Sequence, residues 1–245
     1  MGSKPSENKG LSRRAFFQKT GAVVTALGLA ELSTRLGIPA KAKDYSQALA
    51  ETKGRKLALL VGIDKYPDKA IPEGQETNGL AGCVTDVMLQ KMLLIHRFGF
   101  LPEDIVCLTN EAATREGIYQ AFADHLIDQA KPGDAVVFHF SGYGAQVRIA
   151  DLVGGQATQR SLVPVDGLLP TEKRPTLHDI SEIELKGLLK QLKTKNVTTV
   201  LDAGFMELGL PLSGGLRSRT RSALVTGQLP APFPKLTNQR SAKES

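Results

Sequence analysis

The sequence is poor in the residues that build metal sites and disulfide frameworks. It has two cysteines, Cys83 and Cys107, and four histidines among 245 residues. Neither cysteine belongs to a C-x-x-C pair, and the histidines show no H-E-x-x-H or similar spacing. These absences exclude a disulfide scaffold and a zinc site, and we therefore predict no metal ligand and no resident cofactor.

Long apolar runs and basic clusters interleaved with aromatic residues are also missing. The apolar stretch at 20–30 is shorter than the ~20 residues that a membrane-spanning helix needs. The formal charge of +6 comes from the chain ends: residues 1–42 contain seven Lys or Arg against two acids, whereas residues 43–214 carry a net charge of −4. This distribution excludes a nucleic-acid-binding core.

The first 42 residues have the order of an export signal. Arg13 and Arg14 precede an aromatic pair, the short apolar stretch follows, and Ala40-Lys41-Ala42 forms a small-x-small cleavage site. This order predicts a twin-arginine signal peptide over 1–42, followed by a linker over 43–54. We therefore expect delivery to the periplasm or another exported compartment, with no membrane span once the signal is removed. An ordinary amphipathic helix with a chance arginine pair is the alternative.

From residue 55 onward the sequence alternates between apolar strands and amphipathic helices. The strands are covered on both faces, because their runs lack polar alternation. Strands are predicted at 56–63, 105–108, 135–140 and 196–201, and helices at 86–97, at 114–131 after the cap Thr114, and from the cap Ser181. The order predicts an α/β domain over 55–214 with a mainly parallel sheet flanked by helices. Function is then expected in the loops that begin at Asp64, Ser141 and Asp202.

Seven short motifs follow one another in the order of one peptidase family. They are Leu60-Val-Gly-Ile63, Leu80-Ala-Gly-Cys-Val-Thr-Asp86, Phe98-Gly-Phe100, Ile105-Val-Cys-Leu-Thr109, Phe138-His-Phe-Ser-Gly-Tyr-Gly144, Leu162-Val-Pro-Val-Asp166 and Val200-Leu-Asp202. Together they resemble the caspase-like cysteine peptidases, and most closely the bacterial metacaspases, over about 150 residues. The resemblance implies the three-layer caspase-hemoglobinase fold and the large-subunit domain of a cysteine-type endopeptidase.

The sequence departs from this pattern at both positions of the catalytic dyad. Tyr143 stands where the resemblance implies the histidine base, and Gly204 stands where it implies the cysteine. A phenol with an ordinary pKa near ~10 is a poor general base at neutral pH. Glycine offers no nucleophilic side chain. We therefore predict a pseudo-peptidase with no intact catalytic residue, which acts by binding or scaffolding.

Four other side chains come into question as replacements for the lost dyad. Cys83 lies at the head of a helix, where the pKa of a thiol can fall. Cys107 lies within a strand, Ser213 is nine residues beyond Gly204, and His139 is expected to be a core histidine with a ring nitrogen on a backbone or helix partner. None is a convincing replacement. The alternatives are an endopeptidase that cleaves after Arg or Lys through a nucleophile such as Cys83, or a structural periplasmic module held by an uncleaved signal helix.

The resemblance also gives a role to Asp86 and Asp202, because the matching aspartates of metacaspase-like enzymes line the pocket for a substrate Arg or Lys. Two converging carboxylates suit a guanidinium, which they engage through charged hydrogen bonds. We therefore expect peptides or proteins with exposed Arg or Lys as partners. Alternatively, Asp86 is a solvated helix residue and Asp202 caps the turn after its strand. The resemblance also allows a calcium requirement, but no calcium site can be assigned.

The sequence after Phe205 is short for a caspase-like enzyme, with about forty residues. Residues 215–245 are basic and contain Pro and Gly, which predicts a largely disordered tail with room for one short strand at 223–226. The sheet would then be incomplete on one edge. An open edge can pair with another chain, so a partner subunit, a missing gene segment and homodimerisation all stay open.

Overall fold

The computed structural model describes residues 53–71, 79–150, 156–205, 219–221, 225–226, 228, 230 and 233. The predicted signal peptide and most of the predicted linker lie outside the described residues, as does Ser213. In the described part of the chain, no helix is both long enough and apolar enough to cross a membrane.

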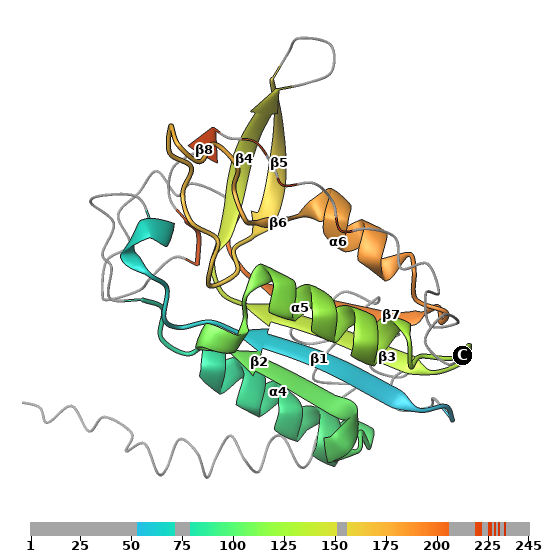
Figure 1. Ribbon diagram of the computed structural model, residues 1–245. Helices are drawn as coiled ribbons and strands as arrows, with labels where there is room; N and C mark the ends of the chain where they lie inside the picture. The colour runs from blue at the N-terminus through green and yellow to red at the C-terminus, as the bar shows by residue number, and fades with distance from the viewer. Residues whose placement is uncertain are drawn as a thin grey trace, which may run out of the picture. The chain divides into compact units, whose positions relative to one another are not determined.

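A four-stranded parallel sheet forms the centre of the fold (Figure 1). Its strands, in spatial order, are β2 (Ile105–Thr109), β1 (Lys56–Gly62), β3 (Ala135–Ser141) and β7 (Asn196–Asp202). The two inner strands are almost wholly buried, which explains why their sequences show no polar alternation. Gly62 pairs with Ser141, and Ser141 pairs with Asp202, so these strands end level with one another. Their carboxyl ends therefore meet at one edge of the sheet.

Helices cover both faces of this sheet and complete the three layers. On one face, α4 (Cys83–Phe98) packs Val87 and Leu94 against alternate residues of β1. On the other face lie α5 (Arg115–Ala121), its π-helical continuation η4 (Phe122–Ile127) and α6 (Glu182–Leu189). The predicted caps are present, since Thr114 accepts a hydrogen bond from Gly117 N and Ser181 accepts one from Glu184 N.

A second sheet was not predicted from the alternation, although its strand β8 lies within the short strand expected at 223–226. Its strands are β4 (Gly144–Ala150), β5 (Gln156–Leu162), β6 (Ile180–Ser181) and β8 (Val225–Thr226). β4 and β5 form an antiparallel hairpin, and β8 pairs in parallel with β4 (Figure 1). The hairpin begins three residues after β3 ends, so it stands directly at the carboxyl edge of the parallel sheet.

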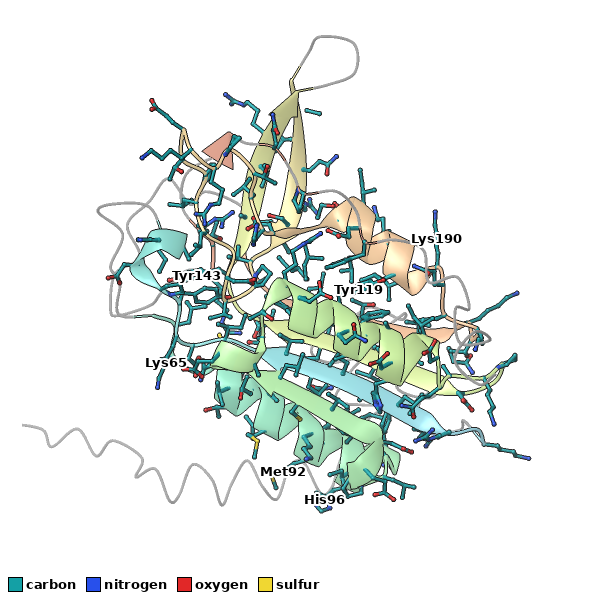
Figure 2. The ribbon with its side chains drawn as sticks, viewed as in Figure 1. Lys65, Met92, His96, Tyr119, Tyr143 and Lys190 are labelled. Carbon is teal, nitrogen blue, oxygen red and sulfur yellow. The ribbon has the colours of Figure 1, made fainter. Side chains whose placement is uncertain are left out.

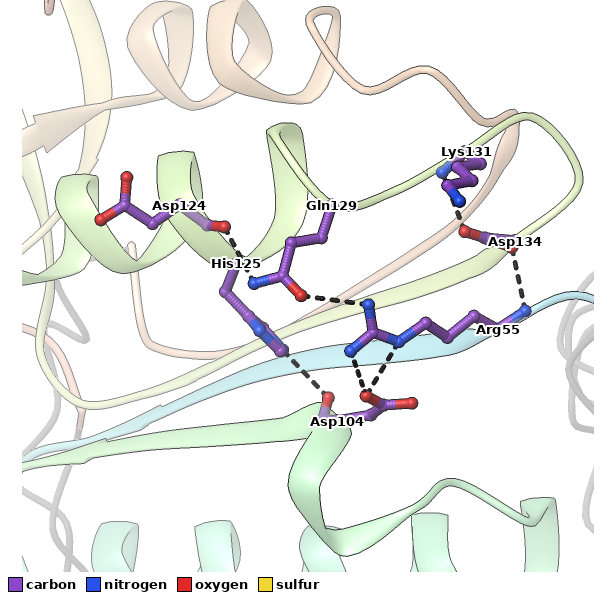
Figure 3. A network of polar contacts seen from close by, with 7 residues as sticks. All are labelled: Arg55, Asp104, Asp124, His125, Gln129, Lys131 and Asp134. Atoms are coloured by element: carbon purple, nitrogen blue, oxygen red, sulfur yellow. Dashed lines mark hydrogen bonds and ion pairs between the residues drawn. The ribbon is translucent and has the colours of Figure 1, made fainter. Parts of the chain in front are cut away.

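The opposite edge of the parallel sheet is tied together by a polar network (Figure 3). Arg55 donates from Nε and Nη2 to Asp104 Oδ1 at 2.9 and 2.5 Å, and from its backbone N to Asp134 Oδ1 at 2.9 Å. His125 Nε2 lies 3.0 Å from the backbone oxygen of Asp104. Arg55, Asp104 and Asp134 each immediately precede a strand of the sheet, so the network fixes the amino ends of β1, β2 and β3 relative to one another.

Candidate functional site

The carboxyl edge of the parallel sheet brings two aspartates and a serine together. Asp86 comes from the first turn of α4, Ser141 ends β3 and Asp202 ends β7. Ser141 Oγ donates to Asp86 Oδ2 at 3.0 Å. The start of α4 is itself fixed by Asp64, whose Oδ1 accepts a hydrogen bond from Cys83 N at 2.7 Å. Side chains from three elements therefore form one acidic cluster, defined here as Asp86, Ser141 and Asp202.

The guanidinium of Arg219 lies within the acidic cluster. Its Nη2 donates to Asp86 Oδ2 at 2.7 Å, and its Nη1 donates to Ser141 Oγ at 2.6 Å and to the Asp202 carboxylate. Burial lowers the pKa of Arg219, but the hydrogen bond to Asp86 and the nearby negative charges outweigh burial and raise that pKa above its ordinary value. The structure thus brings both predicted aspartates to one cation, and this cation belongs to the chain itself.

The backbone of the same arginine is held as well as its side chain. The carbonyl oxygen of Arg219 accepts hydrogen bonds from Gly144 N and Gly204 N, each at 2.9 Å. Arg221 N donates to Gly144 O at 2.8 Å, so residues 219–221 run beside the start of β4 as a short parallel bridge. Two backbone N–H groups that converge on one carbonyl oxygen are the donor arrangement that can stabilise a developing oxyanion.

Tyr143, at the position implied for the histidine base, belongs to the hydrophobic core. It is only 3% exposed, and its ring centroid lies 4.8 Å from that of Tyr66. The hydroxyl of Tyr66 accepts a hydrogen bond from Tyr143 N at 3.0 Å and donates one to Val163 O at 2.9 Å. Figure 2 shows Tyr143 where the two sheets meet. The side chain of residue 143 therefore lies in the core, and the backbone N of this residue is held by the Tyr66 hydroxyl.

Gly204, at the position implied for the nucleophile, has no space for a side chain. A Cβ built there would overlap Thr220 Oγ1 and would lie 3.1 Å from both the carbonyl carbon of Arg219 and the backbone N of Thr220. Real Cβ atoms essentially never approach a neighbour as closely as this overlap requires. The volume that a cysteine side chain would need is therefore occupied by the chain's own Thr220.

The alternative nucleophile Cys83 has the wrong environment for a reactive thiol. It is fully buried, and burial raises its pKa to about 11. Burial also raises the pKa of Cys107. A thiol with a raised pKa carries little thiolate near neutral pH, so it is a weak nucleophile. Within the described ranges, no group of three or more His, Cys, Asp or Glu side chains could hold a metal ion.

His139 differs from the expected core histidine in one respect. It is 4% exposed, as expected, but neither ring nitrogen has a hydrogen-bond partner among the described residues. The predicted backbone or helix partner is therefore not found. Burial lowers the pKa of this imidazole, while Asp86 and Asp202 act in the opposite direction. His139 thus lies two residues before Ser141 on β3, with a pKa below its ordinary value and no hydrogen-bond partner among the described residues.

The sequence reasoning missed Arg219 and Thr220 because it assigned residues 215–245 to a largely disordered tail, with room only for one short strand at 223–226, within which β8 lies. The described parts of that tail pack on the domain. Besides residues 219–221, β8 pairs with β4, and the ring of Phe233 stacks on Tyr119 at 3.8 Å between centroids. One signal was present in the sequence: arginines alternate with other residues in a segment that follows a domain with a net negative charge.

The parallel sheet with helices on both faces, joined to a hairpin at its carboxyl edge, defines a caspase-like α/β domain. The sequence model of the family described as "Metacaspase, peptidase C14 domain" matches residues 56–212, which is more than half of the chain. The chain therefore belongs to the metacaspase family of caspase-like peptidase C14 domains.

Curated relatives and one solved structure resemble this chain over part of their length. Metacaspase-1 of Meyerozyma guilliermondii is 34% identical over 129 residues, which cover 50% of this chain and 29% of that protein. Metacaspase-1 of Schizosaccharomyces pombe is 33% identical over 129 residues, covering 50% and 28%. The chain thus spans less than a third of these relatives. A crystal structure of a Geobacter sulfurreducens protein aligns with a TM-score of 0.46 at 20% identity, over 64% of this chain and 52% of that one.

Proposed function

We propose that this domain is an exported, non-cleaving member of the metacaspase family that binds arginine-containing peptide segments. The observation that carries the proposal is the arrangement around Arg219, in which two carboxylates and a hydroxyl hold the guanidinium and two backbone N–H groups hold the carbonyl. Charged hydrogen bonds to a planar guanidinium favour arginine over neutral side chains. The groups that would bind a substrate arginine in a peptidase site are therefore present in this chain.

The base and the nucleophile that would cleave a peptide bond are absent at both dyad positions. Gly204 carries no side chain, so no thiol can attack a bound carbonyl. Tyr143 is packed in the core against Tyr66 and supplies no imidazole. Cys83 is buried and has a pKa of about 11. A bound peptide accordingly meets hydrogen-bond donors and acceptors at this site without a base and nucleophile pair.

Turnover of Arg- and Lys-ended fluorogenic peptides by the purified protein, with and without calcium, tests this proposal. We expect no release of the fluorophore above a boiled sample in either condition. Activity that iodoacetamide abolishes would contradict the proposal, and loss of that activity in Cys83→Ala would assign it to Cys83. Activity that survives iodoacetamide would also contradict it and would point to a nucleophile other than a thiol.

A further inference from the structure

We propose that the segment Arg219–Arg221 is the resident occupant of the arginine site, held in the position of a substrate's scissile bond, and that an external arginine peptide binds only when this segment leaves. This inference rests on the proposed function, because it concerns the same site. It adds two points. The arginine that occupies the site belongs to the chain itself, and the peptide bond after this arginine lies where the scissile bond of a substrate would lie.

The first argument is that Arg219 uses the groups that would recognise another guanidinium. Asp86, Ser141 and Asp202 all contact it. The side chain of Arg219 is 21% exposed, so its ion pairs are partly shielded from solvent. A second guanidinium at these carboxylates would bring two positive charges into contact, which is unfavourable at a partly buried site. The two ligands therefore exclude each other.

The second argument is the position of the peptide bond between Arg219 and Thr220. A Cβ at residue 204 would lie 3.1 Å from the carbonyl carbon and 3.1 Å from the amide nitrogen of this bond. The carbonyl oxygen points at two N–H donors, those of Gly144 and Gly204. A nucleophile carried by residue 204 would therefore face the carbon atom that it has to attack. The segment lies in the register of a substrate and not merely across the site.

The third argument is the match between Gly204 and Thr220. Thr220 Oγ1 lies where the first side-chain atom of residue 204 would stand. A cysteine at this position would collide with Thr220 or displace it. The glycine removes the group that could cut the bond and also provides the volume that the threonine fills. One substitution thus accounts both for the intact bond and for its close fit.

The fourth argument is that residue 221 anchors the segment. Arg221 Nη1 donates to Gly167 O at 2.9 Å and to Asp179 Oδ1 at 3.1 Å, and Nη2 donates to Asp179 Oδ2 at 2.5 Å. Neither side chain of this pair has exposed surface. A ligand that is tethered and anchored in this way competes at a high effective concentration with any free peptide.

A competition experiment on the full chain tests the occupancy. The probe is the blocked tripeptide Ser-Arg-Thr, and the control probe is Ser-Gln-Thr. The opened variant is Arg219→Gly with Thr220→Gly, Arg221→Met and Asp179→Leu, which removes the guanidinium and the threonine side chain and releases the anchor of the segment without leaving a buried unpaired charge. Arg97→Gln is the matched charge control, because Arg97 is exposed at the far end of α4.

We expect the opened variant to bind Ser-Arg-Thr about tenfold or more tightly than the unmodified protein and the Arg97→Gln control, as removal of a tethered competitor requires. Ser-Gln-Thr should bind weakly to all three. Equal affinity of the opened variant and the unmodified protein for Ser-Arg-Thr would overturn the occupancy and leave the proposed function standing. Absence of binding by the opened variant would overturn the proposed function and also the proposal that the segment Arg219–Arg221 excludes external peptides.

A pair of substitutions tests the register independently of any binding. Gly204→Ala should lower the free energy of unfolding, because a Cβ at residue 204 would overlap Thr220 Oγ1, and Thr220→Gly in the same chain should recover much of that loss. Gly187→Ala is the control, because nothing lies within 4 Å of a Cβ built there. An equal loss from Gly204→Ala with and without the Thr220 side chain, measured by urea denaturation, would overturn the register.

Discussion

Arg221 and Asp179 form an ion pair whose two side chains are completely enclosed by the protein. Removal of one partner from a buried pair leaves an uncompensated charge, which typically destabilises a protein by about 3–5 kcal/mol. We therefore expect Asp179→Asn to lower the free energy of unfolding by that amount, measured by urea denaturation. Glu182→Gln is the control, since Glu182 pairs with Lys186 at the surface and its loss should matter little.

A second arm of this stability experiment separates charge from packing. Replacing both partners, Arg221→Met with Asp179→Leu, removes the buried charge and should restore much of the lost stability. If Asp179→Asn behaved like the surface control, the pair would not be buried in solution and the anchor of the segment would be in doubt.

The recognition of arginine should depend on the two aspartates to different degrees. A charged hydrogen bond contributes on the order of 1.5–3 kcal/mol, so Asp86→Asn in the opened variant should weaken binding of Ser-Arg-Thr about tenfold or more. The Asp202 side chain is 53% exposed against 31% for Asp86. Solvent screens an exposed pair, so Asp202→Asn should have the smaller effect in calorimetry. Indifference to both substitutions would show that these carboxylates are structural.

The folded protein should lose stability through His139 when the pH falls. Burial lowers the pKa of this imidazole. The unfolded chain takes up a proton near pH ~6.5 while the folded protein does not, so the stability contribution is complete above that pH and is lost as the pH falls through the lower, folded-state pKa. The difference in urea midpoint between about pH 7.5 and 5.5 should shrink in His139→Gln and stay unchanged in the exposed control His96→Gln. Equal differences in the two variants would refute this assignment.

Restoring the dyad should turn the resident segment into a substrate. In Gly204→Cys with Tyr143→His and Thr220→Gly, removal of the threonine side chain leaves space for the introduced thiolate beside the carbonyl carbon of Arg219, to which it adds. The bond to the amide nitrogen of residue 220 then breaks, the leaving amine takes the proton held by the imidazole, and water hydrolyses the thioester. Mass spectrometry should find a fragment that begins at residue 220. The same variant with Arg219→Gln should stay intact, and cleavage at another site would contradict the register.

Export should require the arginine pair of the N-terminal segment. Replacing Arg13 and Arg14 by Lys keeps the charge but removes the feature that a twin-arginine receptor reads. We expect the double-lysine variant to accumulate in the cytoplasm of the producing cell, as measured by fractionation and immunoblotting. The single replacement Lys9→Arg is the control and should not alter delivery. Unchanged delivery of the double-lysine variant would show that this is not a twin-arginine signal.

The parallel sheet could be predicted because its signal is local. Each inner strand is a continuous apolar run, and Thr114 and Ser181 mark helix starts through hydrogen bonds to residues three positions away. The hairpin of β4 and β5 was missed although β4 carries a local strand signal, because Ala145, Val147 and Ile149 alternate with polar residues. β5, with the sequence Gln156-Ala-Thr-Gln-Arg-Ser-Leu162, is mostly polar and gives little local signal. The packing partners of the hairpin include Leu177, which contacts Val147 from 30 positions further along the chain, and a local pattern does not encode such a contact.

The two aspartates of the acidic cluster could be predicted from the sequence, whereas the arginine that pairs with them could not. Asp86 and Asp202 could be singled out because the motifs around them resemble a family in which those positions line a pocket. Arg219 could not, because its contact with Asp86 joins residues 133 positions apart in the sequence. Proximity over such a distance is a property of the packed structure, and the composition of residues 215–245 predicts the opposite behaviour.

The described residues 219–221, 225–226 and 233 pack against residues that lie at or before residue 205 in the chain. Their contacts comprise the pairs of Arg219 and Arg221, the strand β8 beside β4, and Phe233 between Arg115 and Tyr119. Non-covalent contacts therefore hold these two parts together in addition to the covalent connection. A chain nicked once between residues 205 and 219 would behave as a two-chain complex, and the C-terminal fragment could be added back as a separate molecule.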